Sequence, residues 1–161
     1  MTAHDIEFAL ICVHDSKFNY RRWLVVPNVS WGVRGIDHEC DLLAVSGSGY
    51  AHEIEIKVSV SDLRRDRTKR HGHYSELIRC LWFAGPKAMQ EQLLAESPER
   101  AGVIVADDGR ARVMREATPS NAPKLSDAQL LAVARLGTMR YWTRRDPSRE
   151  PPQLQLIGEV I

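Results

Sequence analysis

Apolar and polar residues alternate along the chain in blocks, and the spacing within each block predicts a helix or a strand. Apolar residues three or four apart indicate helices, and residues two apart on a common face indicate strands. Pro27 interrupts one strand near its end, which predicts an edge strand or a bulge. The expected elements are a helix at 3–15, a strand at 22–29, strands at 39–46 and 50–59 joined by a turn at 47–49, a helix from 61 to about 74 capped by Ser61 or Asp62, a strand at 77–86, a short helix at 87–96, a hairpin over 101–117 turning at 108–109, and a helix over about 125–143 capped by Ser126.

The order of these elements predicts the fold class. A helix, a strand, a hairpin, a helix and a further strand form an α/β protein with a mixed central sheet flanked by helices. The 161 residues suggest a single domain, with a core over about 3–117 followed by the C-terminal helix.

The segment HEIEIKVS at 52–59 carries an unusual strand pattern. Its apolar side chains face one way, while Glu53, Glu55 and Lys57 face the other. One interpretation is an amphipathic strand with a solvated, ion-paired face. The other is a site in which these charges do chemistry, and the neighbouring strand bears on the choice.

Asp41 lies on the strand that feeds the hairpin. That strand is apolar on both faces after its first residues, which indicates a buried, central position. Asp41 at its start and Glu55 toward the end of the antiparallel partner are expected to be neighbours. Two adjacent carboxylates repel each other unless a cation lies between them, and a hard ion such as Mg²⁺ suits oxygen ligands. Lys57 would lie beside that ion, where it would either orient an attacking water or stabilise the charge that develops on a phosphate.

Asp41, Glu55 and Lys57, in this order around a hairpin, resemble the signature of the PD-(D/E)XK nuclease superfamily, although Cys40 replaces the proline of its name. The resemblance implies a restriction-endonuclease-like fold, a metal site of Mg²⁺ or Mn²⁺ held by Asp41 and Glu55 with the carbonyl of Ile56 as a third ligand, and a catalytic role for Lys57. The superfamily often adds an acid from the first helix, which here would be Glu7.

Longer segments resemble the MmcB family of DNA-repair proteins and its phage and prophage relatives. The resemblance covers about residues 5–142 and implies an action on DNA. It is carried by ECDLLAVSGSGYAHEIEIKVSVSDLRRDRTKRHGHY, CLWFAGP and AGVIVADDGRARVMRE.

The helix after Lys57 is locally basic. Residues 61–79 hold six Lys or Arg against three acids, although the net charge of the chain is only +1. A local patch can bind phosphates without a basic total, and a solvated helix with internal ion pairs is the alternative. Trp31 could stack on a base or cap the core. The expected DNA-binding residues are Arg64, Arg65, Lys69, Arg70, His73 and Trp31.

Other features narrow the class of protein. No apolar run approaches 18 residues, and the N-terminus lacks the pattern of a signal peptide, so we expect a cytoplasmic protein of a bacterium or an infected one. The three cysteines have no metal-type spacing and are expected to be reduced. His71 and His73 have only Cys80 and His52 as nearby partners, which argues against zinc there.

Together these observations predict a metal-dependent nuclease that hydrolyses DNA phosphodiester bonds in repair or phage DNA processing. A homodimer is one arrangement by which so small a nuclease could cut both strands. The first alternative is a DNA-binding accessory protein that keeps the fold but cuts little or nothing. The second is a structural or interaction domain that has no dependence on divalent ions.

Overall fold

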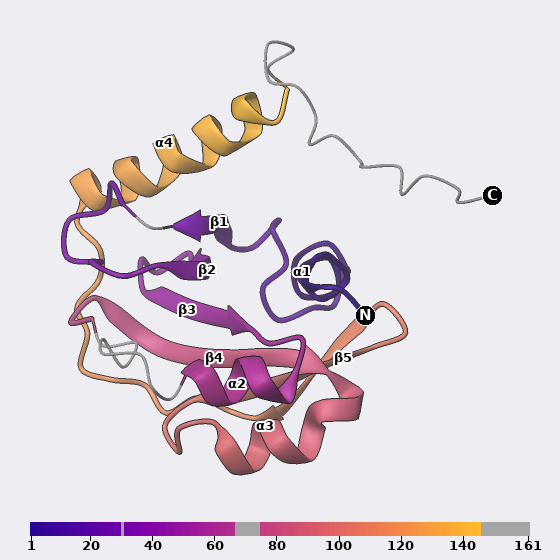
Figure 1. The fold of residues 1–161 in the computed structure, drawn as a ribbon. Coiled ribbons are helices and arrows are strands. Elements are labelled where there is room, and N and C mark those ends of the chain that lie inside the picture. The colour runs from indigo at the N-terminus through magenta and orange to yellow at the C-terminus, as the bar shows by residue number, and fades with distance from the viewer. Residues whose placement is uncertain (30, 67–74, 146–161) are drawn as a thin grey trace.

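The computed structural model describes residues 1–29, 31–66 and 75–145. Six strands form a single sheet, flanked by helices (Figure 1). The elements are α1 (Ala3–Ile11), β1 (Leu24–Val29), β2 (Cys40–Val45), β3 (Ala51–Ile56), α2 (Val60–Asp66), β4 (Ile78–Pro86), the 3₁₀ helix η1 (Lys87–Met89), α3 (Gln90–Glu96), β5 (Gly102–Asp107), β6 (Arg110–Arg115) and α4 (Asp127–Thr143).

The sheet is mixed, and its strand order follows the chain from β1 to β6. The β1–β2, β2–β3 and β5–β6 pairs are antiparallel, whereas β3–β4 and β4–β5 are parallel. The parallel β3–β4 pair requires a crossover, and α2 lies in that connection. The predicted α/β class with a mixed central sheet is confirmed, and the arrangement is compatible with a restriction-endonuclease-like fold.

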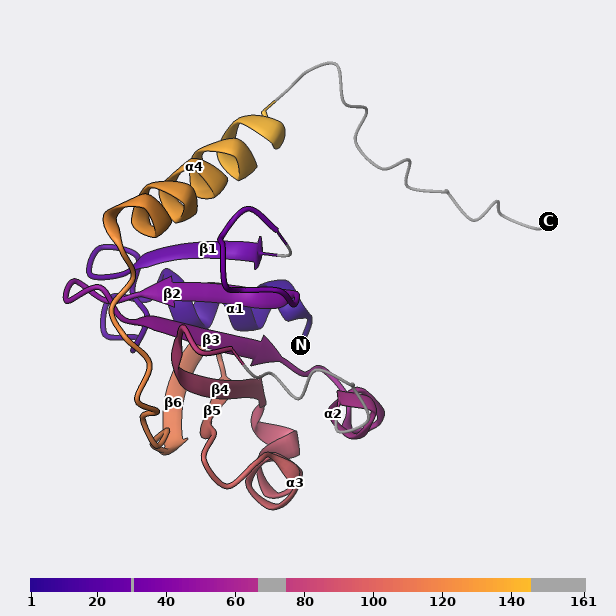
Figure 2. The same cartoon turned by 90° about the vertical axis from the view of Figure 1, so that its left-hand side faces the viewer.

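One face of the sheet is covered by α1. Figure 2 shows this helix behind β2 and β3, while α4 lies along β1. Ile6, Ala9 and Leu10 of α1 are fully buried, so this helix anchors the first apolar cluster. The strand residues of that cluster are Leu42, Ala44, Ile54, Ile56, Cys80, Trp82, Ala84, Ile104 and Ala106.

The opposite face carries two separate apolar clusters. One joins α4, through Val133 and Leu136, to residues of β1 and β2 that include Leu43. The other joins α2 and α3 to residues of β4 and β5 that include Leu81 and Phe83. Glu53 and Glu55 of β3 lie on this face and belong to neither cluster.

The boundaries of two helices differ from the sequence prediction. The first helix ends at Ile11 rather than at residue 15. The helix after β3 starts at Val60, and its cap is the side chain of Ser59, whose Oγ accepts the N–H of Asp62 at 3.2 Å. Ser61 and Asp62 are therefore inside the helix. The part of the predicted helix at 67–74 lies outside the described residues, as does the end of the chain from 146.

The predicted hairpin turn at 108–109 and the predicted cap of the last helix are confirmed. Asp108 and Gly109 both have positive φ, as a two-residue hairpin turn between β5 and β6 requires. Ser126 caps α4 by accepting the N–H of Gln129, whose side chain accepts from Ser126 in return. The expected irregularity near Pro27 is present in the edge strand β1, where Asn28 has a φ of 51°.

His52 makes the stability of the fold depend on pH. Its Nδ1 accepts a hydrogen bond from Nε1 of Trp82 at 3.3 Å, in a packed site. Burial, followed by the charges of Lys17 and Arg79, lowers the pKa of His52 to about 4. The unfolded chain therefore binds more protons between about pH 6.5 and 4, and stability is lost as the pH falls through that window.

We expect the free energy of unfolding to fall by about 2 kcal/mol between pH 7 and pH 5 because of His52 alone. Urea unfolding at both pH values would measure this in the wild type and in His52→Gln, whose amide oxygen can still accept from Trp82. The variant should lose this part of the pH dependence. An identical pH dependence in both proteins would assign the effect to other groups.

Candidate functional site

The polar side chains of β3 are buried. Glu53 is 0% exposed, Glu55 is 1% exposed and Lys57, just after the strand, is 3% exposed. The interpretation of this face as a solvated surface is therefore wrong. Burying ionised side chains is costly unless they are paired and hydrogen-bonded, so the contacts of each of these groups matter.

Glu55 and Lys57 form a buried ion pair. Nζ of Lys57 donates to Oε2 of Glu55 at 2.8 Å, and the ammonium lies 5.8 Å from the centre of the Phe83 ring. The two residues stand two apart, so they share one side of the strand, as the sequence pattern predicts. The backbone N–H of Lys57 bonds to the carbonyl of Ala84, which holds the end of β3 against β4.

Asp41 lies beside the same part of β3. Its Oδ2 accepts the backbone N–H of Ile56 at 2.8 Å, while its Oδ1 has no hydrogen bond to any described residue. The register pairs Leu42 with Ile54, and extending it by one residue places Asp41 opposite Glu55. Asp41 therefore reaches the Glu55–Lys57 segment through the hydrogen bond between its side chain and the backbone of Ile56. Among the described residues, it makes no direct hydrogen bond with Glu55.

A local distortion accompanies this placement. β1 pairs Pro27 with Leu42 and Val29 with Cys40, and Asn28 between them has positive φ. The backbone irregularity of the edge strand therefore lies next to Asp41. Asn and Asp tolerate this conformation better than most residues, so the local sequence permits it.

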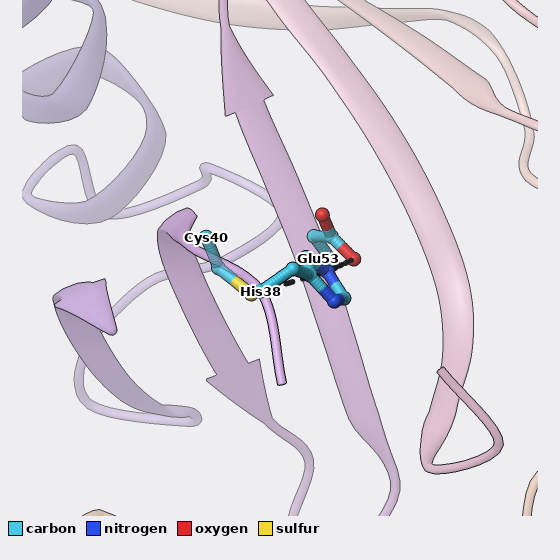
Figure 3. A group of neighbouring side chains, drawn as sticks. All are labelled: His38, Cys40 and Glu53. Carbon is cyan, nitrogen blue, oxygen red and sulfur yellow. Dashed lines mark hydrogen bonds and ion pairs between the residues drawn. The ribbon is translucent and has the colours of Figure 1, made fainter. Parts of the chain in front are cut away.

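A second polar cluster lies on the same face of β3. Nε2 of His38 is 2.8 Å from Oε2 of Glu53 and 3.7 Å from Sγ of Cys40 (Figure 3). Ligand atoms of these three residues all lie within 4.8 Å of one another. Burial raises the pKa of the Cys40 thiol well above its ordinary value, and the carboxylates of Glu53 and Glu55 raise it further. The buried and acidic environment of the cluster therefore disfavours the thiolate form of Cys40.

The sequence prediction did not include His38, and it gave Glu53 and Cys40 no common site. The three cysteines are not spaced like metal ligands, but that observation did not consider a cysteine together with a histidine and an acid. The available signal was a His-x-Cys pair at the start of one hairpin strand and an acid in the middle of the other. Neither feature is specific by itself, and only the pairing of β2 with β3 brings them together.

The structure does not bring Glu7 to this group. It lies on α1, whose buried side chains pack on the opposite face of the sheet, and its carboxylate is 3.7 Å from Nδ1 of His4. Trp31 is 57% exposed in the segment after β1, so the interpretation of Trp31 as a core cap is wrong. A role in stacking on a base stays a prediction.

The predicted basic helix is described only in part. Arg64 pairs with both carboxylate oxygens of Glu96 on α3, with N–O distances of 2.9 to 3.2 Å, and remains 64% exposed. Arg65 is exposed as well. Lys69, Arg70 and His73 lie outside the described residues, as does His71.

These features define a class of protein: an α/β chain with a mixed six-stranded sheet that carries buried carboxylates and a lysine on its central hairpin. A family model described as "DNA repair protein MmcB-like" matches residues 18–147. The chain belongs to this MmcB-like family, which links it to DNA repair.

A solved structure gives independent support for the fold. The SPO1766 protein of unknown function from Silicibacter pomeroyi is similar with a TM-score of 0.57 and 23% sequence identity, covering 82% of this chain and 86% of that one. None of the curated proteins compared with the chain matches it. Among the described residues, no helix is long and apolar enough to cross a membrane.

Proposed function

We propose that this protein is a metal-dependent nuclease that hydrolyses DNA phosphodiester bonds. The observation that carries the proposal is the buried ion pair of Glu55 and Lys57. Asp41 accepts a hydrogen bond from the backbone between these two residues. Charges buried in a fold are costly, so their presence indicates a function that needs them. Membership of a DNA-repair family makes DNA the expected partner.

The donor set fits Mg²⁺ or Mn²⁺. Asp41 and Glu55 supply carboxylate oxygens, and Ile56 between Glu55 and Lys57 supplies a carbonyl oxygen, which are ligands that hard divalent ions prefer. Bound there, the ion would act as a Lewis acid on a phosphate oxygen. Lys57 would donate hydrogen bonds to the negative charge that develops on the phosphate. The hydrogen bond from Ile56 to Asp41 would hold that carboxylate in place.

The accessory-protein alternative has one observation in its favour. Glu55 and Lys57 are almost inaccessible to solvent, so a phosphodiester group cannot reach them without some rearrangement of the covering residues. A protein that kept the pair for stability and bound DNA elsewhere would show this burial too. Cleavage assays separate the two functions. Metal binding is measured first, because the proposed cleavage depends on a bound ion.

We expect a divalent ion to bind the wild type with millimolar or better affinity and to bind Asp41→Ala at least about tenfold more weakly, since one carboxylate ligand is lost. Calorimetric titration with Mn²⁺ measures this. Asp15→Ala, which removes an exposed acid from the segment after α1, is the control and should match the wild type. Equal heats for wild type and Asp41→Ala would show that the site is wrongly assigned.

The second expected result concerns DNA binding by α2. Replacing Arg64 and Arg65 together with alanine should weaken binding and reduce the slope of log K against log salt by about 1 to 2, since each phosphate contact releases counterions. The control is the double alanine variant of Arg110 and Arg112, which lie on β6 at the far edge of the sheet. It removes the same number of positive charges as the α2 variant. If both double variants keep the wild-type slope, α2 is a solvated surface.

A further inference from the structure

The cluster of His38, Cys40 and Glu53 has a composition that differs from the oxygen ligands of Asp41 and Glu55. It offers one imidazole nitrogen, one sulfur and one carboxylate oxygen. Hard ions such as Mg²⁺ take oxygen ligands, whereas Zn²⁺ takes nitrogen, sulfur and oxygen together. The chemistry of the three donors therefore points to a transition metal of the zinc type.

The spacing of the donors is close to what such an ion needs. Bonds of about 2.3 Å to sulfur and about 2.0 Å to nitrogen or oxygen, at tetrahedral angles, place the ligand atoms roughly 3.3 to 3.6 Å apart. Sγ of Cys40 and Nε2 of His38 are 3.7 Å apart, and Nε2 of His38 and Oε2 of Glu53 are 2.8 Å apart. Sγ of Cys40 and the carboxylate oxygen of Glu53 lie within 4.8 Å of each other. Admitting an ion therefore requires the donor atoms to move by up to about 1 Å.

The backbone holds two of the three donors firmly. Glu53 stands in the middle of the sheet, paired with Leu43 on one side and Leu81 on the other. Cys40 is fully buried and pairs with Val29 at the start of β2. His38 comes from the segment that leads into β2, and its side chain is 8% exposed. An ion would therefore tie this segment to the central strand, and would enter past His38.

We propose that His38, Cys40 and Glu53 bind a zinc ion, at a site separate from the one formed by Asp41 and Glu55. Three protein ligands leave a fourth position for water or another donor. The ion would replace the contact between His38 and Glu53 and would neutralise the buried carboxylate. This site goes beyond the proposed nuclease activity and does not depend on it.

The first test uses cobalt as a spectroscopic probe in place of zinc. The 161-residue chain, stripped of metal by a chelator, is titrated with Co²⁺. A sulfur ligand is seen as a thiolate-to-cobalt charge-transfer band in the near ultraviolet. We expect the band in the wild type and in Cys12→Ser, whose thiol is exposed, and its loss in Cys40→Ser. A folded wild type without the band at saturating Co²⁺, or a band unchanged in Cys40→Ser, would overturn the proposal.

The second test is equilibrium dialysis against Zn²⁺ with the metal content measured by mass spectrometry. We expect about one ion per wild-type chain at this site, bound at least tenfold more weakly in His38→Gln and in Glu53→Gln. Asp41→Ala should keep its zinc while losing its Mn²⁺ site, which distinguishes this proposal from the proposed function. Zinc affinity that is unchanged in both His38→Gln and Glu53→Gln would assign the ion to other residues.

Discussion

Lys57→Met is expected to reduce DNA cleavage by at least about 100-fold, the scale on which enzymes lose rate when one group that stabilises the transition state is removed. Methionine keeps most of the buried volume of lysine and removes the ammonium that contacts Oε2 of Glu55. Binding of Mn²⁺ should persist, because Asp41 and the carboxylate of Glu55 remain. Binding of DNA should persist as well, because Lys57 is not among the residues that we predict to bind DNA.

The burial of the pair adds a cost in stability. Removing one partner of a buried ion pair costs about 3 to 5 kcal/mol, so the variant must be assayed below its measured unfolding midpoint. Lys87→Met is the matched control, since Lys87 forms an exposed ion pair with Asp107 at the end of β5. Both variants would be tested on single-stranded, duplex and branched DNA with Mg²⁺ or Mn²⁺.

Each outcome of this assay assigns a function. If the wild type cuts and folded Lys57→Met keeps nearly its full rate, Lys57 has no catalytic role. If the wild type binds DNA and metal but cuts none of the substrates, the accessory-protein function replaces the nuclease. If cleavage falls with Lys57→Met and not with Lys87→Met, the nuclease proposal stands.

Gly102→Ala is expected to destabilise the fold by at least about 2 kcal/mol, because it adds a methyl group where no space exists. Gly102 on β5 pairs with Trp82 on β4, and the indole lies across it. A Cβ at Gly102 would overlap Cε3 and Cζ3 of Trp82 and lie 2.8 Å from Cδ2. Trp82 is 1% exposed and is held by its hydrogen bond to His52, so it has no room to move away.

Gly47→Ala is the control for this prediction. Gly47 lies in the turn between β2 and β3, and a Cβ there would have no heavy atom within 4 Å. Urea unfolding should give the control a stability close to that of the wild type, while Gly102→Ala should lose at least the stated amount. A Gly102→Ala protein as stable as Gly47→Ala would show that the contact between β5 and Trp82 relaxes freely.

Local sequence determined the elements of this protein. Alternation in 52–59 predicts β3, the Asp108–Gly109 pair predicts the turn between β5 and β6, and Ser126 predicts the start of α4. Each of these features depends on residues that are close together in the chain. The mixed sheet followed from the order of elements, since parallel neighbours need a crossover helix. Asp41, Glu55 and Lys57 were recognisable as a motif for the same reason: the hairpin that brings them together is itself local.

Only the tertiary structure decided the environment of these residues. Periodicity shows that Glu53, Glu55 and Lys57 share one side of β3, but a solvated face and a buried one have the same period. Their burial depends on how this face of the sheet is packed, with the apolar cluster of α4 on one side and that of α2 and α3 on the other. The same packing separates Glu7 from the Glu55–Lys57 pair and joins His38 and Cys40 to Glu53. Contacts between remote segments set which charges meet, and no local pattern encodes them.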